Sequence, residues 1–153
     1  MRDDELAAFL DRGVAMLGAV ADDGCVPEVF RVWGASIDDA GQVRALASSD
    51  AGRTLGALRD GTRVSLTFTD VTNFESVQLK GSATGPAAPP GPADIELMRR
   101  YDETFVPKLR SIGHPTRLAD RIRPVAVFVI TAVVDRRYDQ TPGADAGAAV
   151  GAG

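Results

Sequence analysis

Short stretches in which apolar and polar residues alternate predict a chain built mainly of β-strands. Valine, leucine and phenylalanine occupy every second position in residues 64–69, and the same alternation recurs in residues 77–80. This period of two is typical of strands with one buried face. In all, the pattern predicts six strands, the last of them the most apolar, at residues 14–21, 27–37, 42–47, 64–69, 77–80 and 125–134.

Turn sequences between the early strands indicate hairpin-like connections. Asp22-Asp23-Gly24 follows the first strand, and Asp38-Asp39-Ala40-Gly41 follows the second. The proline-rich segment 85–92 cannot sustain helix or ladder hydrogen bonds, so it marks a surface connection. Because the chain lacks the regular strand–helix alternation of a parallel sheet, we expect a mainly β fold, an antiparallel six-stranded barrel with short peripheral helices.

Three short helices are expected around these strands. Asp3 and Asp4 are cap-type residues for a first helix that Gly13 ends. A second helix is expected at residues 51–59, after Ser48 and its polar neighbours. A third opens at Asp94 and is expected to end near Pro107. It places apolar residues on one stripe, suited to covering a sheet face or a barrel mouth: Met98, Tyr101 and Phe105.

The length and composition favour one domain. A chain of 153 residues with 44% hydrophobic content is long enough to bury one compact core. We expect this domain to span residues 1–142. Residues 143–153 are rich in alanine and glycine, have little side chain to bury, and are expected to form a flexible tail.

Charge and cysteine content narrow the partners and the compartment. The formal net charge of −4 argues against nucleic acid, whose binding draws on clustered lysine and arginine. Cys25 is the single cysteine, so no intrachain disulfide or cysteine-based zinc cluster can form. The acidic N-terminus leads into only a short apolar stretch, unlike a secretory signal or a membrane span. We expect a cytoplasmic protein with no membrane association.

The strongest candidate chemistry is an anion site after the third strand. Ser48, Ser49 and Asp50 precede a predicted helix whose first turn contains Arg53 and Thr54. Unpaired backbone N–H groups and the helix dipole favour an anion there, and a guanidinium adds charge-assisted hydrogen bonds. The alternative is that Arg53 is an ordinary solvated arginine.

Two further pairs are weaker candidates. Arg31 and Trp33 lie two residues apart on one strand face and could flank an aromatic ligand; alternatively Trp33 is core and Arg31 pairs with a carboxylate. Gln78 and Lys80 share a polar strand face and could bind a heterocycle, or could simply be solvated. His114 is the sole histidine, and no metal-binding, hydrolytic or phosphate-loop motif accompanies it, so no catalytic residue or metal is assigned.

The order of motifs resembles the pyridoxamine 5′-phosphate oxidase-like family of FMN-binding split β-barrels. The resemblance covers about residues 6–85 and rests on VAMLGAVADDGCVPEVFRVWG, then VRALASSDAGRTLGALRDGTRVSLTF, then SVQLKGSATG. It implies a homodimer that holds FMN in a groove between two subunits. The residues that match the family's phosphate-binding positions are Ser48, Ser49, Arg53 and Thr54. Those that correspond to regions beside the flavin ring are Arg31, Trp33, Gln78 and Lys80.

Departures from the family's motifs limit the function that the resemblance implies. Where the vitamin B6 oxidases have consecutive Arg-Lys, this chain has Arg53-Thr54, and their later Arg-Gln pair is Glu75-Ser76 here. Their C-terminal substrate-binding pattern of arginine and histidine is also absent. The resemblance therefore implies an FMN-binding oxidoreductase acting on another small-molecule substrate. The alternative is a non-enzymatic storage or sensor module, and deazaflavin and haem remain alternative cofactors.

Overall fold

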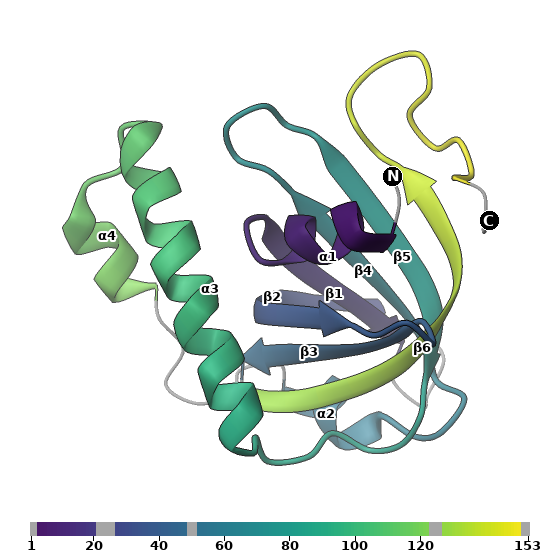
Figure 1. Ribbon diagram of the computed structural model, residues 1–153. Coiled ribbons are helices and arrows are strands. Elements are labelled where there is room, and N and C mark those ends of the chain that lie inside the picture. Colours follow the sequence, from purple (N-terminus) through teal and green to yellow (C-terminus); the bar gives the residue numbers. More distant parts are fainter. Residues whose placement is uncertain (1–2, 21–26, 49–51, 123–126, 151–153) are drawn as a thin grey trace.

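The computed structural model describes residues 3–20, 27–48, 52–122 and 127–150. Its six strands close into one antiparallel barrel in the order β1-β2-β3-β6-β5-β4, as Figure 1 shows. Their bounds are β1 (Val14–Val20), β2 (Pro27–Ile37), β3 (Gln42–Ser48), β4 (Arg63–Thr69), β5 (Ser76–Ala83) and β6 (Val127–Asp139). The predicted fold class, a mainly β protein with an antiparallel six-stranded barrel, is confirmed. The first predicted turn, at residues 22–24, lies outside the described residues.

Alternation along the strands fills the barrel with apolar side chains. Leu17 of β1 lies opposite Leu66 of β4, which in turn lies opposite Leu79 of β5, and all three are almost fully buried. Phe30 and Phe68 extend the same core. Since side chains of directly paired residues point to the same face, this inner layer forces the intervening residues of these strands onto the outer face.

One irregularity in β2 reverses that alternation. The pairing of β2 with β3 shifts between Val32 and Ala35, so that two residues of β2 oppose one residue of β3. Before the bulge, even-numbered residues such as Phe30 and Val32 face the core. After it, odd-numbered residues such as Ala35 face the core. Gly34 supplies the left-handed φ of 123° that the bulge needs, and its missing side chain lets helix α3 approach.

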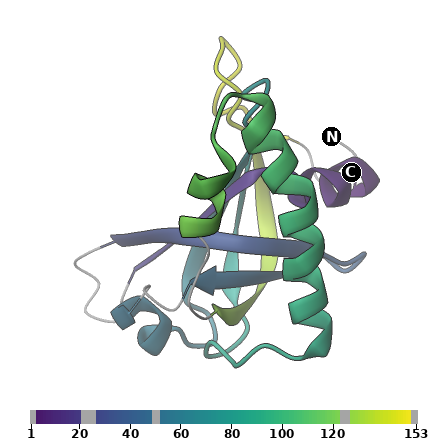
Figure 2. The same cartoon turned by 90° about the vertical axis from the view of Figure 1, so that its left-hand side faces the viewer.

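Four helices surround the barrel: α1 (Asp3–Leu10), α2 (Gly52–Ala57), α3 (Pro92–Ser111) and α4 (Thr116–Arg121). Leu6, Phe9 and Leu10 of α1 are buried in the barrel core. Leu55 places α2 against one end of the barrel, at the bottom of Figure 1. Figure 2 shows the long helix α3 lying along the outside of the barrel, with α4 folded back beside it.

The bounds of α3 correct the sequence-based prediction at both ends. The helix begins at Pro92, two residues before Asp94, because proline is favoured in a first turn whose N–H groups have no helical partner. It also continues through Pro107 to Ser111. Proline removes one helical hydrogen bond, but burial of Phe105 before it and Leu109 after it keeps the helix on the barrel.

The last strand and α4 also differ from the prediction. β6 extends five residues beyond 134, to Asp139, because its second half pairs with β5 and places Tyr138 opposite Gln78. Because these residues are mostly polar, a prediction based on apolar runs did not include them in the strand. Helix α4 was not predicted; it is six residues long, and all of its described side chains are exposed.

Part of the predicted tail returns to the barrel. The N–H of Gly147 donates to the carbonyl of Asp139 at 2.7 Å, and the N–H of Val150 donates to that of Arg137 at 2.9 Å. Ala149 forms an isolated bridge with Tyr138. The flexibility of the tail remains a prediction. Among the described residues, none of the helices has the length and apolar character that crossing a membrane requires.

Gly81 allows a test of barrel closure. A Cβ on this residue would lie 2.1 Å from the carbonyl oxygen of Val133, at the point where the register of β5 and β6 shifts. We expect Gly81→Ala to lower the free energy of unfolding by about 2–3 kcal/mol. Gly56→Ala is the matched control, since it meets nothing within 4 Å on helix α2 and should raise stability by about 0.5–1 kcal/mol. Urea unfolding followed by circular dichroism measures both, and equal effects would contradict this account of closure.

Candidate functional site

A groove of about 430 Å³ lies where the first residues of β2 meet β1 and α2. It brings together two of the arginines predicted from the sequence, Arg31 from β2 and Arg53 from α2. The remaining lining residues are Met16, Glu28, Val29, Phe30 and Gly52. The groove therefore combines apolar walls with two cations and one carboxylate, which suits a ligand with an anionic end.

Arg31 is held in one orientation by aromatic rings. Its guanidinium carbon lies 5.0 Å from the ring centroid of Trp33, 5.9 Å from that of Tyr101 and 4.9 Å from that of Phe105. Its Nη2 donates to the hydroxyl of Tyr101 at 2.5 Å. Such contacts place a cation by cation–π attraction and leave part of its hydrogen-bonding capacity for a ligand.

The charge of Arg31 is not balanced by a carboxylate within the described residues, none of which forms an ion pair with it. Burial lowers the pKa of Arg31, while the nearby Tyr101 oxygen acts in the opposite direction. An arginine remains charged all the same, so the groove contains a partly desolvated cation to which no described carboxylate is paired. An anion that entered the groove would supply the missing charge.

Trp33 does not line this groove. Its side chain is 5% exposed and packs beneath α3 with a second apolar cluster that includes Tyr101 and Phe105. Its indole N–H has no hydrogen-bond partner among the described residues. The structure thus places Trp33 as a buried support for Arg31, and direct contact with a ligand ring remains a prediction.

Arg53 and Thr54 converge on a carboxylate of the same chain. The N–H of Thr54 donates to Oε2 of Glu28 at 3.2 Å, and the hydroxyl of Thr54 donates to the same oxygen. Nη2 of Arg53 lies 3.6 Å from Oε1 of Glu28, although the Arg53 side chain is 79% exposed. Two of the four residues predicted to bind a phosphate, Arg53 and Thr54, are therefore brought together around an anion, the carboxylate of Glu28.

Of the two serines predicted to bind a phosphate, only Ser48 lies within the described residues. Ser48 is the last residue of β3, where it lies opposite Val127 and is almost fully buried. Ser49 lies outside the described residues. Their predicted role in binding a phosphate stays a prediction.

Gln78 and Lys80 lie on the outer face of the same sheet as Arg31. Successive strand pairs place Arg31 opposite Met16, Met16 opposite Thr67, and Thr67 opposite Gln78. Three strand spacings of about 4.8 Å separate the ends of this row, or about 14 Å in all along the curved surface. The amide nitrogen of Gln78 donates to the hydroxyl of Thr67 at 3.1 Å. The structure thus joins the two predicted pairs through one continuous outer face.

Lys80 belongs to the next row on that face. It lies opposite Ser65 of β4, which lies opposite Gly18 of β1. Its ammonium is 4.9 Å from the ring centroid of Tyr138. Gly18, Ser65 and Thr67 are small or polar residues in the middle of this outer face, and Met16 lies between Arg31 and Thr67.

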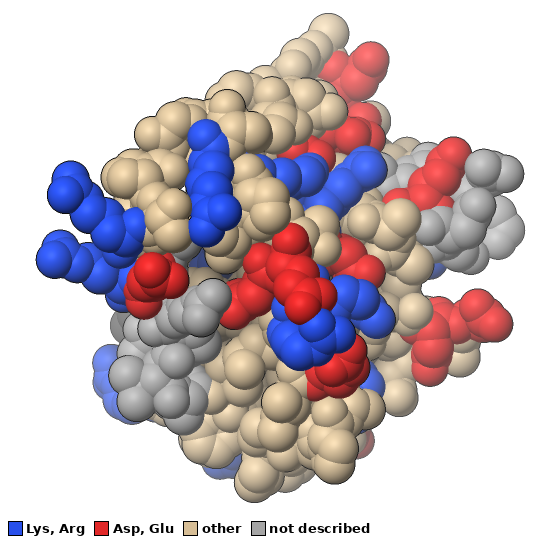
Figure 3. Space-filling model, turned by 60° about the vertical axis from the view of Figure 1, so that its left-hand side comes forward, with Lys and Arg blue, Asp and Glu red and all other residues tan. Residues whose placement is uncertain are grey.

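Charges on the face covered by α3 largely neutralise one another. Figure 3 shows acidic and basic side chains interspersed in the middle of this view, with basic side chains gathered at its left edge. Arg99 pairs with Glu96 at 2.5 Å and also with Glu103, and Arg100 lies 3.2 Å from Asp11. This exposed face offers no continuous basic surface, in contrast to the unbalanced Arg31.

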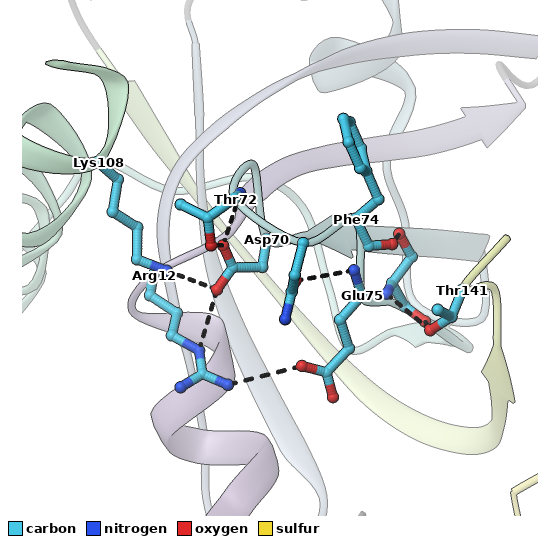
Figure 4. A network of polar contacts seen from close by, with 9 residues as sticks. Arg12, Asp70, Thr72, Phe74, Glu75, Lys108 and Thr141 are labelled. Carbon is cyan, nitrogen blue, oxygen red and sulfur yellow. Dashed lines mark hydrogen bonds and ion pairs between the residues drawn. The ribbon is translucent and has the colours of Figure 1, made fainter. Parts of the chain in front are cut away.

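A second polar cluster lies at the opposite end of the barrel, where β4 ends and β1 begins (Figure 4). Asp70 accepts hydrogen bonds from Lys108 of α3 at 2.5 Å and from the N–H of Thr72 at 3.0 Å. Arg12 lies 3.5 Å from Asp70 and 3.8 Å from Glu75. Each charged group here has a partner, so the cluster ties α3 and the first strand to the β4–β5 loop.

Burial alone would raise the pKa of Asp70, but hydrogen bonds from Lys108 and Thr72 outweigh it and lower this pKa to about 2. The carboxylate is therefore ionised at neutral pH and stabilises the fold. Among the described residues, no group of three or more histidine, cysteine, aspartate or glutamate side chains is arranged to hold a metal ion.

Comparison with known proteins places the fold. HupZ of Group A Streptococcus is 18% identical; its crystal structure matches 96% of this chain and 100% of its own, with a TM-score of 0.53. A candidate pyridoxamine 5′-phosphate oxidase of Lactobacillus delbrueckii is 14% identical, and its structure matches 88% of this chain and 91% of its own, with a TM-score of 0.50. The chain has the pyridoxamine 5′-phosphate oxidase-like split-barrel fold. At these identities the similarity establishes the fold alone. No protein-family model and no curated protein sequence matches the chain.

Sequence reasoning missed two residues that shape the groove. Glu28 had no recognisable signal, because one acidic residue at a strand end is ordinary. Tyr101 was assigned to plain packing, although its hydroxyl also positions Arg31 and donates to the carbonyl of Gly13 at 3.0 Å. The four-residue spacing of Tyr101 and Phe105 was the available signal, since it stacks their rings on the side facing the barrel.

Asp70→Asn tests the cluster at the far end of the barrel. Because the folded state lowers the pKa of Asp70, its contribution is fully present well above pH 4 and is lost as the pH falls toward 2. We expect the variant to lose about 2 kcal/mol of stability at pH 7 and the difference from the wild type to shrink below pH 4. Asp120→Asn, on the exposed helix α4, is the control with the same chemistry. A pH-independent difference in urea unfolding would contradict the assignment.

Proposed function

We propose that this protein binds FMN in the groove between β2, β1 and α2 and acts as an oxidoreductase. The observation that carries the proposal is Arg31, a partly buried arginine that aromatic rings hold at the groove and that has no carboxylate partner among the described residues. The split-barrel fold and the family resemblance of residues 6–85 supply the identity of the ligand. The proposal therefore combines two arguments: Arg31 attracts an anion to the groove, and the family that the sequence resembles binds FMN on this fold.

Two regions of the surface would hold the two parts of the cofactor. Arg31, which the resemblance places beside the flavin ring, lies in one groove with Arg53, so we assign it to the phosphate together with Arg53, Thr54 and the predicted Ser48 and Ser49. The flavin ring would lie on the outer face, beside residues that include Gln78 and Lys80. When bound, FMN supplies hydride or electron transfer, and the protein supplies binding, orientation and electrostatics.

The substrate is proposed only as a small molecule other than a vitamin B6 phosphate. The phosphate segment reads Arg53-Thr54 rather than Arg-Lys, and Ser76 binds within its own chain, where its N–H donates to the hydroxyl oxygen of Thr141 at 3.1 Å. Glu28 is the only carboxylate among the described lining residues, and it is engaged by Thr54. No residue of the groove is assigned as a proton donor or acceptor.

A second copy of the chain would complete the site. The outer face that would carry the flavin ring also exposes Val29, with 63% of its surface accessible, beside the groove. One exposed valine is ordinary on a protein surface, so the support for an interface is the family resemblance of residues 6–85. We therefore propose a homodimer with the cofactor at the subunit interface, which light scattering after size-exclusion chromatography measures.

The absorption spectrum of the purified protein, before and after addition of FMN, tests the proposed cofactor. We expect a flavin spectrum, or saturable binding of added FMN with quenching of its fluorescence. A deazaflavin spectrum would change the cofactor within the same groove, and a haem spectrum would overturn the flavin assignment. Haem has less support because the sole histidine, His114, is exposed in the loop between α3 and α4. Protein that binds none of these ligands would refute the proposal.

Redox turnover then separates an enzyme from a storage or sensor module. The flavin-loaded protein is mixed with NADH, NADPH or a reduced deazaflavin, and flavin reduction and reoxidation are followed by absorbance. Reduction by one donor and reoxidation by an acceptor support an oxidoreductase. Bound FMN that none of these donors reduces would favour storage or sensing.

Arg31→Gln tests which cation dominates binding. Because Arg31 is oriented and partly buried, we expect its loss to weaken FMN about 10–100-fold, equivalent to 1.5–3 kcal/mol. Arg53→Ala should cost no more than about fivefold, since exposed charges contribute little. Arg99→Gln, on the exposed face of α3, is the control. Fluorescence titration measures the affinities, circular dichroism verifies folding, and a larger loss in Arg53→Ala would reverse the ranking.

A further inference from the structure

Glu28 occupies the position at which the cofactor phosphate is expected. One of its oxygens accepts the N–H and the hydroxyl of Thr54, and the other faces Arg53. Thr54 is completely buried, so its hydroxyl cannot turn to water for another partner. The donors assigned to the phosphate are therefore already engaged with a carboxylate from the same chain.

We propose that Glu28 is a built-in competitor of the ligand phosphate and that a phosphate binds only when this carboxylate leaves Thr54. This inference rests on the proposed function for the identity of the ligand, but its geometry is independent of it. It adds a property that the resemblance does not imply, a contact within the chain that weakens anion binding and sets the selectivity of the groove.

Competition follows from the chemistry of the two anions. Carboxylate and phosphate oxygens accept the same charge-assisted hydrogen bonds from a guanidinium, a hydroxyl and a backbone N–H. Both cannot occupy Thr54 together, and a phosphate beside Glu28 would also meet like charge. A phosphate can reach Arg31 while Glu28 stays in place, but it then loses the contacts with Thr54.

The position of Glu28 allows it to move. It is the second residue of β2 and lies opposite Ala19, near the end of the pairing with β1. Its side chain is 28% exposed and lines the groove together with Arg53. A change of side-chain rotamer toward solvent frees Thr54 without breaking the strand, whereas the buried neighbour Phe30 could not move in this way.

The opposing interpretation is that Glu28 is a permanent tie between β2 and α2. In that case its removal would loosen α2 and would weaken, or leave unchanged, the binding of every ligand. The two interpretations predict opposite signs for the effect on phosphate-bearing ligands. They are therefore separable by one pair of ligands, FMN and riboflavin, which differ only in the phosphate.

The test compares Glu28→Gln with the wild type. Glutamine has the same shape and can still accept from Thr54, but it lacks the negative charge. We expect FMN to bind about 5–10-fold more tightly to the variant and riboflavin to bind within twofold of the wild type. Glu96→Gln, on the exposed face of α3, is the matched control and should change neither affinity. Equal or weaker FMN binding by the folded variant overturns the inference.

A double-mutant cycle locates the effect. In a Thr54→Val background, the gain from Glu28→Gln should fall to less than half, because the hydroxyl that Glu28 withholds from the phosphate is then absent. An undiminished gain would show that Glu28 acts through the overall charge and would overturn direct competition. If Glu28→Gln fails to fold, the wild-type complex with FMN decides instead: a crystal structure with Glu28 still bonded to Thr54 refutes the proposal.

A readout with inorganic phosphate separates this inference from the proposed cofactor. At constant ionic strength, phosphate should raise the melting temperature of Glu28→Gln more than that of the wild type or of Glu96→Gln. Such a shift without FMN binding supports the competitor and refutes the FMN assignment. If FMN binds with equal strength to the wild type and to Glu28→Gln, the cofactor assignment is supported and the competitor role of Glu28 is refuted.

Discussion

The hydroxyl of Tyr101 joins the barrel, the long outer helix and the groove. It accepts a hydrogen bond from Arg31 of β2 and donates one to the carbonyl of Gly13, just before β1. Its ring, completely buried, stacks on Phe105 with 5.2 Å between centroids. A buried polar group is tolerated only when its hydrogen bonds are made, so this one oxygen sets both where α3 docks and where Arg31 points. The Gly34 bulge makes the docking possible, since a Cβ there would lie 3.4 Å from that of Tyr101.

The two ends of the barrel differ in how their charged side chains are paired, and we propose ligand binding at only one of them. At one end, Asp70, Lys108 and Arg12 form ion pairs around a carboxylate that is 6% exposed. At the other, Arg31 and Arg53 lie at a groove with one carboxylate between β2 and α2. Balanced charge stabilises a fold, and unbalanced charge attracts a ligand. The distribution of partners, more than the number of charges, distinguishes the two ends.

The anion recognition that we propose for the groove would depend on a balance between Arg31 and Glu28. Among the described residues, Arg31 contacts aromatic rings and one hydroxyl group but no carboxylate. Its positive charge therefore still attracts an anion. Glu28 reduces that attraction by engaging Thr54 and Arg53. A groove with both features discriminates between ligands by how much negative charge they bring and where they place it. The same two residues would thus control affinity and selectivity.

The sequence alone predicted the six strands, their antiparallel arrangement and three of the four helices, because strand alternation and turn residues act locally. It also singled out Arg31, Arg53 and Thr54 as candidate site residues, from short motifs in the sequence. Tertiary structure decided what local patterns do not contain: the course of α3 through Pro107, the extension of β6 to Asp139, and the contacts of Tyr101 and Glu28. Each depends on a partner distant in sequence, such as Tyr101, 70 residues from Arg31. Only closure of the barrel brings residues so distant in sequence into contact. Their contacts therefore follow from tertiary packing and cannot be inferred from the residues next to them in the chain.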